Sequence, residues 1–269
     1  MKKMTIVMVI VVALVAAVFV GCKHSRGKNL DGPGMERNLA ADPNLLPGDF
    51  SVSATKTVKF TKSNLYWDGS AFKFEANQYD YQTSWDVNHV SHFFWTKTEA
   101  NSYAASYSDG TIAVDDVPFF AESQGGLTVE GTEGLYALSS AEWTYLIETR
   151  DNASSLYKNG VRVAGAYDCL IIAPDGYTGT IAESYTAEAW ATAEALGLVC
   201  LPAVGYRRGT ELGLGGIYGN YWSSSPYAND ADCAHDLVFR SGFGHGEARI
   251  NPARCYDSRD YGWSLRLVK

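Results

Sequence analysis

Apolar and polar residues alternate in short segments along the chain, and this period of two predicts β-strands. Residues 52–60 alternate in this way. Residues 64–67 and 71–75 flank the tripeptide Asp68-Gly69-Ser70, which is typical of a turn between two antiparallel strands. The pattern therefore predicts one strand followed by a hairpin near the start of the folded region.

Further strands are predicted later in the chain. Residues 160–173 read as a pair of strands that ends at the turn sequence Pro174-Asp175-Gly176, and the apolar residues 198–203 read as a buried strand. Residues 79–120, by contrast, are aromatic and polar without a clean period. We expect them to form long loops that pack through their own rings.

Two segments predict helices. The sequence Ser139-Ser140-Ala141-Glu142 is a capping box, in which the first and fourth side chains satisfy backbone N–H groups at the start of a helix. One apolar face follows it, formed by Trp143, Leu146 and Ile147. The second helix is predicted over residues 186–196, which are rich in alanine and are followed by the stop residue Gly197.

The C-terminal stretch alternates again, over residues 216–225 and 262–268. We expect the last strand to pair with the first, and Trp222 and Trp263 to lie in the core. Together these elements predict an α+β fold with two helices, a small antiparallel sheet and long irregular loops.

The N-terminal sequence predicts an export signal. Two lysines precede an apolar run over residues 5–20, which is shorter than the about 20 apolar residues of a spanning helix. The run ends at Phe19-Val20-Gly21-Cys22, which resembles a bacterial lipobox, although Phe19 stands where leucine is usual. The resemblance implies that residues 1–21 are a signal peptide and that a lipid on Cys22 anchors the exported chain to the membrane of the cell envelope. Whether it reaches the outer membrane or the cell surface stays open, and an uncleaved anchor is the alternative.

Residues 22–48 are dominated by Gly, Pro, Asn and Asp without an apolar period, which predicts a flexible tether. Residues 49–269 are long enough for one sizeable core in a single domain. Loss of residues 1–21 removes two of the 22 basic residues and none of the 30 acidic ones, which leaves a net charge of −10. Because an acidic chain repels polyanions, we expect no nucleic-acid partner. We also expect a monomer.

The composition of residues 227–261 differs from that of an ordinary surface. This segment holds four of the eleven arginines and none of the eleven lysines, and Glu247 is its only glutamate. Asp, Asn, Ser, Gly, His, Tyr, Cys and Arg fill 23 of its 35 positions, and Gln, Met, Trp and Thr are missing. Solvated surfaces normally mix Lys with Arg and Glu with Asp. The bias therefore indicates a filter at the codon, the alternative being a polar loop region with a chance bias.

Asparagine codons randomised at their adenines encode these residue types and cannot encode Lys, Gln, Met, Trp or Glu. In this respect residues 227–261 resemble the variable region of a target protein of a diversity-generating retroelement. The resemblance is close over residues 210–269 and looser over residues 50–226. It implies a C-type-lectin-type display scaffold, of the branch that includes formylglycine-generating enzymes. Residues 201–210 and 221–224 look like the approach to the ligand face of that branch, and Gly262-x-Ser264-x-Arg266 matches its terminal strand.

The resemblance implies that polar side chains of residues 227–261 face outward and bind an unknown protein or glycan. Tyrosine, arginine, aspartate and asparagine suit recognition because they combine wide amphipathic area with directional hydrogen bonds. The strand-like spacing of Ala234, Leu237 and Phe239 predicts that these face the core, and the resemblance implies that Asn251-Pro252, Arg259 and Gly262 belong to the scaffold. The predicted ligand-binding set is Tyr227, Asp230, Asp232, His235, Asp236, Arg240, His245, Arg254, Tyr256, Asp257, Asp260 and Tyr261.

The sequence offers little support for catalysis or metal binding. His235 and His245 do not have a standard zinc spacing, and the calcium-binding triplets of sugar-binding lectins are missing. The nucleophile elbow, the His-Glu-x-x-His motif and the phosphate loop are also missing. We expect no metal, no cofactor and no enzymatic activity.

Besides Cys22 the chain has four cysteines, and export permits disulfides between them. Cys169 and Cys200 each lie in an apolar run, which predicts that both are small buried hydrophobic residues. Cys233 and Cys255 fall within residues 227–261. Their wide spacing does not match the two closely spaced late cysteines of a formylglycine-generating enzyme.

The sequence therefore predicts a non-enzymatic, lipid-anchored binding protein with a hypervariable face. Two alternatives stay open. One is a fixed-specificity adhesin or pilus-tip-like subunit of the same fold. The other is a degenerate relative of formylglycine-generating enzymes.

Overall fold

The structure is a computed structural model of the chain. It describes residues 41–95, 118–240 and 249–269, except for the side chains of residues 254–257. The predicted signal peptide, the lipidation site Cys22 and His245 lie outside these residues. Within the described ranges, no helix is both long enough and apolar enough to span a bilayer.

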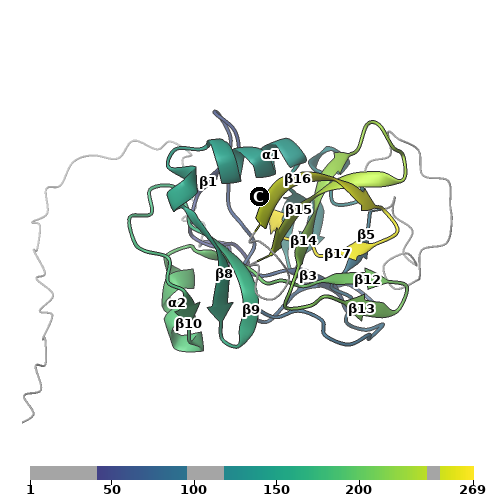
Figure 1. Cartoon of the computed structure of the whole chain (residues 1–269), viewed down its shortest axis with the longest axis horizontal. Helices are drawn as coiled ribbons and strands as arrows, with labels where there is room; N and C mark the ends of the chain where they lie inside the picture. Colours follow the sequence, from purple (N-terminus) through teal and green to yellow (C-terminus); the bar gives the residue numbers. More distant parts are fainter. Residues whose placement is uncertain (1–40, 96–117, 241–248) are drawn as a thin grey trace, which may run out of the picture. The chain divides into compact units, whose positions relative to one another are not determined.

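Small sheets, mostly antiparallel, and two α-helices make up the described part of the chain, which confirms the expected α+β class (Figure 1). The helices are α1 (Ser140–Thr144) and α2 (Ala187–Ala195). Shorter helical turns are η1 (Glu122–Gln124), η2 (Tyr145–Thr149, a π-helix that continues α1) and η3 (Ala153–Ser155).

Local signals predict both helices correctly. The Ser139 side chain accepts a hydrogen bond from the N–H of Glu142, and the Glu142 carboxylate accepts one from the N–H of Ser139, as a capping box requires. Helix α2 has Thr186 at its N-cap and is followed by Gly197 in the left-handed region, with φ 87°. These partners lie within a few residues of each other, so sequence spacing is enough to identify the helix ends.

Residues 52–60 do not form the single strand that their alternation predicts. Val52 and Ser53 both donate backbone hydrogen bonds to the carbonyl oxygen of Lys56, at 2.9 and 3.3 Å, which closes a tight turn. The turn separates β1 (Phe50–Ser51) from β2 (Thr57–Val58). The next hairpin is confirmed: the turn at residues 68–70 joins β3 (Leu65–Trp67) to β4 (Phe72–Phe74).

The folded unit begins before the expected boundary at residue 48. Asn44 and Leu46 are buried, and the N–H of Leu46 donates to the carbonyl oxygen of Phe60 at 2.9 Å. The last residues of the predicted tether therefore pack against the folded unit. Burial of the apolar Leu46 side chain in the core stabilises this arrangement.

The C-terminal strand pairs with the first strand region, as predicted. Lys59 and Lys269 exchange two backbone hydrogen bonds of 2.9 Å, and Phe60 forms a bridge with Val268. The same C-terminal segment closes a three-stranded sheet of β18 (Leu267–Val268), β7 (Thr132–Ala137) and β6 (Leu127–Val129). The two ends of the folded unit thus hold each other.

A four-stranded sheet confirms the strands predicted over residues 160–173 and 198–203. Its order is β10 (Ser184–Tyr185), β8 (Tyr157–Val163), β9 (Ala166–Ile172) and β11 (Val199–Leu201), with β10 parallel to β8.

Two further sheets build the region that carries the candidate site. One consists of β14 (Gly219–Pro226), β15 (Cys233–Arg240) and β16 (Arg249–Ser258). The other has the order β13 (Glu211–Gly213), β12 (Tyr206–Arg208), β17 (Gly262–Trp263) and β5 (Phe93–Phe94). Helix α1 packs against all three strands of the first sheet (Figure 1).

The predicted core positions of this region are buried. Leu237 and Phe239 lie in a cluster with Trp143 of α1, and Ala234, Trp222 and Trp263 lie in a second cluster. The spacing of apolar residues in the 227–261 segment therefore predicted the inward side chains correctly.

Candidate functional site

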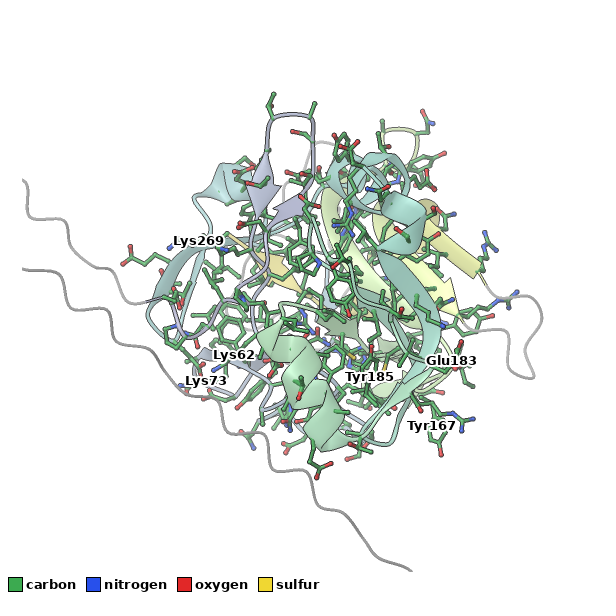
Figure 2. The ribbon with its side chains drawn as sticks, turned by 90° about the vertical axis from the view of Figure 1, so that its left-hand side faces the viewer. Lys62, Lys73, Tyr167, Glu183, Tyr185 and Lys269 are labelled. Atoms are coloured by element: carbon green, nitrogen blue, oxygen red, sulfur yellow. The ribbon has the colours of Figure 1, made fainter. Side chains whose placement is uncertain are left out.

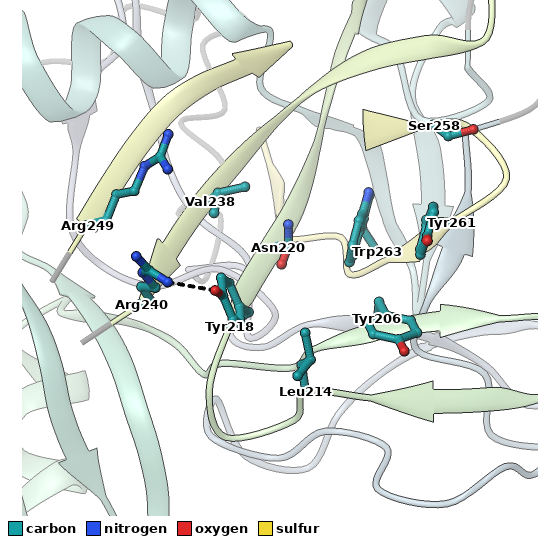
Figure 3. A pocket seen from close by; sticks show the side chains of 10 residues that line it. All are labelled: Tyr206, Leu214, Tyr218, Asn220, Val238, Arg240, Arg249, Ser258, Tyr261 and Trp263. Atoms are coloured by element: carbon teal, nitrogen blue, oxygen red, sulfur yellow. Dashed lines mark hydrogen bonds between the residues drawn. The ribbon is translucent and has the colours of Figure 1, made fainter. Parts of the chain in front are cut away.

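A groove of about 630 Å³ lies between the β14–β15–β16 sheet and the β12–β13 hairpin (Figure 3). Its size falls within the range of small-ligand sites, about 300 to 1,000 Å³. The lining residues are Tyr206, Leu214, Tyr218, Asn220, Val238, Arg240, Arg249, Ser258, Tyr261 and Trp263.

The floor of the groove follows from the register of β14 and β15. Asn220 is opposite Val238, and both side chains line the groove. The neighbouring residues Tyr221 and Leu237 are also opposite each other and are buried in the core cluster against α1. Because successive side chains of a strand point to opposite faces, one sheet supplies both the core and the floor.

Two arginines lie at one end of the floor, where β15 ends and β16 begins. Arg240 and Arg249 are directly opposite each other in the register. The Arg240 Nη1 donates a hydrogen bond of 2.7 Å to the hydroxyl of Tyr218, and its guanidinium lies 5.6 Å from the centre of the same ring. Tyr218 therefore holds the Arg240 side chain at the groove (Figure 3).

The backbone at this end is tied to the neighbouring sheet by Asn159 of β8. Its Nδ2 donates to the carbonyl oxygens of Arg240 and Arg249, at 2.6 and 3.3 Å. Its Oδ1 accepts from the N–H of Gly160, which has φ 78° at a register shift of β8. Such a bulge re-aims a side chain out of the regular ladder, here toward the ends of β15 and β16.

Aromatic rings form the other end and the side wall. Tyr261 and Trp263 are stacked, with centroids 5.4 Å apart and an interplanar angle of 8°. Tyr206 of β12 meets both rings edge-on, at 5.6 and 6.3 Å. The three rings support one another, which gives the groove a rigid flat surface.

The wall is anchored from behind by Arg207. Its guanidinium lies 4.2 Å from the ring centre of Phe94 and 5.0 Å from that of Trp85, and the residue is fully buried. Burial lowers the pKa of Arg207 from 12.5 to about 10, so the side chain stays cationic at neutral pH. This contact fixes β12 and with it the position of Tyr206.

Leu214 forms the edge of the hairpin and has an unusual backbone. Its φ is 58°, in the left-handed region, and its side chain is 46% exposed. A residue with a β-carbon is strained in this region, and a leucine that is nearly half exposed gains only part of its burial energy in return. Leu214 also lines a second, smaller cavity of about 190 Å³ on the side of Tyr81.

The predicted ligand-binding residues that the structure describes do not all lie together. Arg240 and Tyr261 line the groove. Tyr227, Asp230 and Asp232 lie in the turn between β14 and β15, and His235 lies at the start of β15 with its ring 5.5 Å from that of Tyr227. Asp260 is half-buried outside the groove lining. His245 and the side chains of Arg254, Tyr256 and Asp257 are outside the described residues.

Asp236 corrects the expectation of an outward side chain. It is fully buried, and its Oδ2 accepts a hydrogen bond of 2.9 Å from Asn220. The prediction assumed that β15 has one solvated face. In the structure α1 packs against β15, and Asp236 is directly opposite the buried Trp222 of β14. The carboxylate therefore belongs to the scaffold.

Sequence reasoning missed several groove residues. Tyr206 and Tyr218 lie within residues 201–210 and 216–225, which had been singled out only as segments, and Arg249 is one of the arginines that mark the biased composition. The available signal was the tyrosine and arginine content of these segments. It could not show which strands come together.

None of the three described cysteines, Cys169, Cys200 and Cys233, is among the described residues that line the groove. No group of three or more His, Cys, Asp and Glu side chains with metal-binding geometry occurs in the described ranges. Cys169 and Cys200 are fully buried thiols, and Cys233 is a half-buried one. Burial, together with a hydrogen bond to Cys169, raises the pKa of Cys200. This matches the expected role of Cys169 and Cys200 as small buried hydrophobic residues.

A comparison of the chain with protein family models, curated proteins and solved structures finds no match.

Proposed function

We propose that this protein is a non-catalytic binding protein that recognises its ligand in the groove between β14–β15–β16 and the β12–β13 hairpin. The observation that carries the proposal is the lining itself. Three tyrosines, one tryptophan and two arginines converge on one cavity from five strands and their flanking turns. These are the residue types that dominate recognition sites, because they provide rigid area and directional polar contacts.

The support behind the groove also favours recognition. Asn159, Tyr218 and Arg207 hold the arginine end and the aromatic wall through contacts that involve no ligand. A preorganised surface loses little conformational entropy on binding, so more of the contact energy appears as affinity.

The proposal places this groove on a C-type-lectin-type scaffold with a retroelement-diversified segment, anchored through a lipid on Cys22 at the cell envelope. Three features support it: the α+β class with two helices, the pairing of the C-terminal strand with Lys59 and Phe60, and the exposed turn that contains Asp230 and Asp232. The ligand in this proposal is a protein or a glycan.

A binding array of glycans and proteins tests recognition by the groove. We expect the double variant Arg240→Gln, Tyr261→Ala to lose the signals of the unmodified protein while it keeps cooperative unfolding. The matched control is Arg162→Gln, Tyr167→Ala on the β8–β9 hairpin, where the Arg162 guanidinium likewise lies over the Tyr167 ring, at 5.2 Å. Tyr167 is 56% exposed and is labelled in Figure 2. Equal loss of signal in both variants would argue against the groove as the site.

The genomic neighbourhood tests diversification separately. A retroelement target needs a near-copy of the DNA for residues 227–261 with adenines at the variable codons, next to a reverse transcriptase. If the template is missing but the groove binds, the fixed-specificity adhesin is the better interpretation.

A further inference from the structure

We propose that the groove binds a ligand in which a sugar ring or an aryl ring, the body of the ligand, carries an oxyanion. The oxyanion is a carboxylate or a phosphate. This inference rests on the proposed function and adds the chemical class of the ligand. Arg240 and Arg249 receive the oxyanion, and the rings of Tyr206, Tyr261 and Trp263 receive the body.

The arginine pair is the first observation. Like charges directly opposite each other on neighbouring strands are destabilising, yet Arg240 and Arg249 occupy such a pair of positions. Asn159 ties both backbones and Tyr218 orients the Arg240 guanidinium. An oxyanion between the two guanidiniums converts the repulsion into charge-assisted hydrogen bonds, which are among the strongest that side chains form.

The charge distribution is the second observation. Among the residues that the structure describes, the groove lining includes two arginines and no acidic residue, although the whole chain has a net charge of −8. The exposed acids Asp230 and Asp232 precede Cys233, at the far end of β15 from Arg240. At about 3.4 Å per residue the two ends of this strand are roughly 24 Å apart. That separation is about three Debye lengths at physiological salt, so these acids do not neutralise the arginine end.

The aromatic end limits the body of the ligand. Tyr261 and Trp263 offer nearly parallel rings, with Tyr206 set edge-on against both. Flat faces of this kind pack against a sugar ring or an aryl ring and exclude water from the polar contacts nearby.

Two sets of matched small ligands test the proposal by ligand-observed NMR titration. The sugar set is glucose, glucuronate and glucose 6-phosphate. The aryl set is 4-hydroxybenzamide and 4-hydroxybenzoate. In at least one set we expect the anion to bind about tenfold more tightly than its neutral partner, which corresponds to about 1.4 kcal/mol. The set that shows this preference identifies the body as sugar or aryl, and added salt should reduce the preference.

Two single variants locate the effect. We expect Arg240→Gln and Arg249→Gln each to remove most of the preference for the anion, and Arg162→Gln, outside the groove, to leave it unchanged. Thermal unfolding of each variant shows whether the fold is intact. Because Arg249 is exposed, its variant keeps the test valid even if Arg240→Gln disturbs the sheet.

The outcomes separate this inference from the proposed function. Equal binding of neutral and anionic probes overturns the oxyanion inference, and so does the absence of binding by every acid. The groove can still be the recognition site in either case, which the array decides. A preference for the anion that persists in both arginine variants also overturns the inference, since it would place the anion elsewhere.

Discussion

The side-chain amide of Asn159 donates to the main-chain oxygen of Arg240 at 2.6 Å and so joins two separate sheets. A second bond from the same Nδ2 reaches the oxygen of Arg249 at 3.3 Å. One side chain thus holds the last residue of β15 and the first residue of β16 in register. The position of both guanidiniums depends on this contact from outside their own sheet.

We expect Asn159→Ala to lower the free energy of unfolding by about 1 to 2 kcal/mol, because two carbonyls lose their donor. Asn159→Asp should cost more, since it sets a carboxylate against two carbonyl oxygens. Urea unfolding measures both. The control Asn229→Ala alters an exposed asparagine and should change stability by less than about 0.5 kcal/mol. If both Asn159 variants match the unmodified protein, Asn159 does not hold the strand ends.

Leu214 should tolerate glycine unusually well. Its φ of 58° is strained for leucine, so Leu214→Gly is expected to leave the free energy of unfolding unchanged or to raise it by up to about 1 kcal/mol. Leu196, which is 58% exposed and has φ −86°, is the matched control, and Leu196→Gly should be destabilising by about 0.5 to 1 kcal/mol. Similar losses in both variants would show that the Leu214 backbone is not strained.

His92 should make the protein less stable in mild acid. Burial lowers its pKa from 6.5 to about 4, with smaller contributions from Arg207 and His89, while the Val204 carbonyl opposes the shift. Between these two pH values the unfolded chain binds a proton that the folded chain does not, so stability falls as pH drops from about 6.5 toward 4. At about 1.4 kcal/mol per unit the loss is at most roughly 3 kcal/mol.

Comparison of the unmodified protein with His92→Gln isolates this effect, because the other titrating groups cancel. We expect the variant to lose less stability than the unmodified protein between pH 6.5 and 4. Measurements at pH 8, where His92 is neutral in both states, give the baseline difference. Parallel curves over the whole range would contradict the assignment.

Arg266 connects three parts of the chain through neutral acceptors. It is fully buried, and it donates to Asn64, Thr61, Gln78 and Cys200, with the shortest bond, 2.6 Å, to the carbonyl oxygen of Cys200. Arg266→Met should lower the free energy of unfolding by about 3 to 5 kcal/mol, because these acceptors stay buried without a donor. If the methionine variant does not fold, the free energy of unfolding is measured on Arg266→Lys instead. The exposed Arg162→Met serves as control, and an equal effect at both sites would remove the special role of Arg266.

Burial should protect two of the thiols. In a chain with Cys22→Ser and Cys255→Ser, we expect iodoacetamide to modify Cys233 and to spare Cys169 and Cys200, which are fully buried. All three should react in urea, as mass spectrometry of the labelled peptides will show. Native-state labelling of Cys200 at the rate of Cys233, or a disulfide between Cys169 and Cys200, would contradict this.

Local signals made much of the fold predictable. The capping box of Ser139 and Glu142 and the turn at residues 68–70 involve partners within three residues, so sequence spacing is enough to identify them. The interpretation of residues 52–60 as one strand was wrong because a tight turn at Lys56 competes with continued extension. Alternation alone does not reveal that competition.

The sequence by itself identified Ala234, Leu237 and Phe239 of β15 as core positions. In the structure Leu237 and Phe239 lie in the cluster with α1, and Ala234 lies in the other core cluster. Only the tertiary structure decided what covers the face of β15 opposite Leu237 and Phe239. On that face Asp236 is buried by other parts of the protein, whereas Val238 and Arg240 line the groove. The physical reason is that the period of two is a property of one strand, whereas cover depends on which other strands pack against it. Tyr206 and Trp263 reach the groove through the pairing of β12 with β17, a contact between segments distant in the chain.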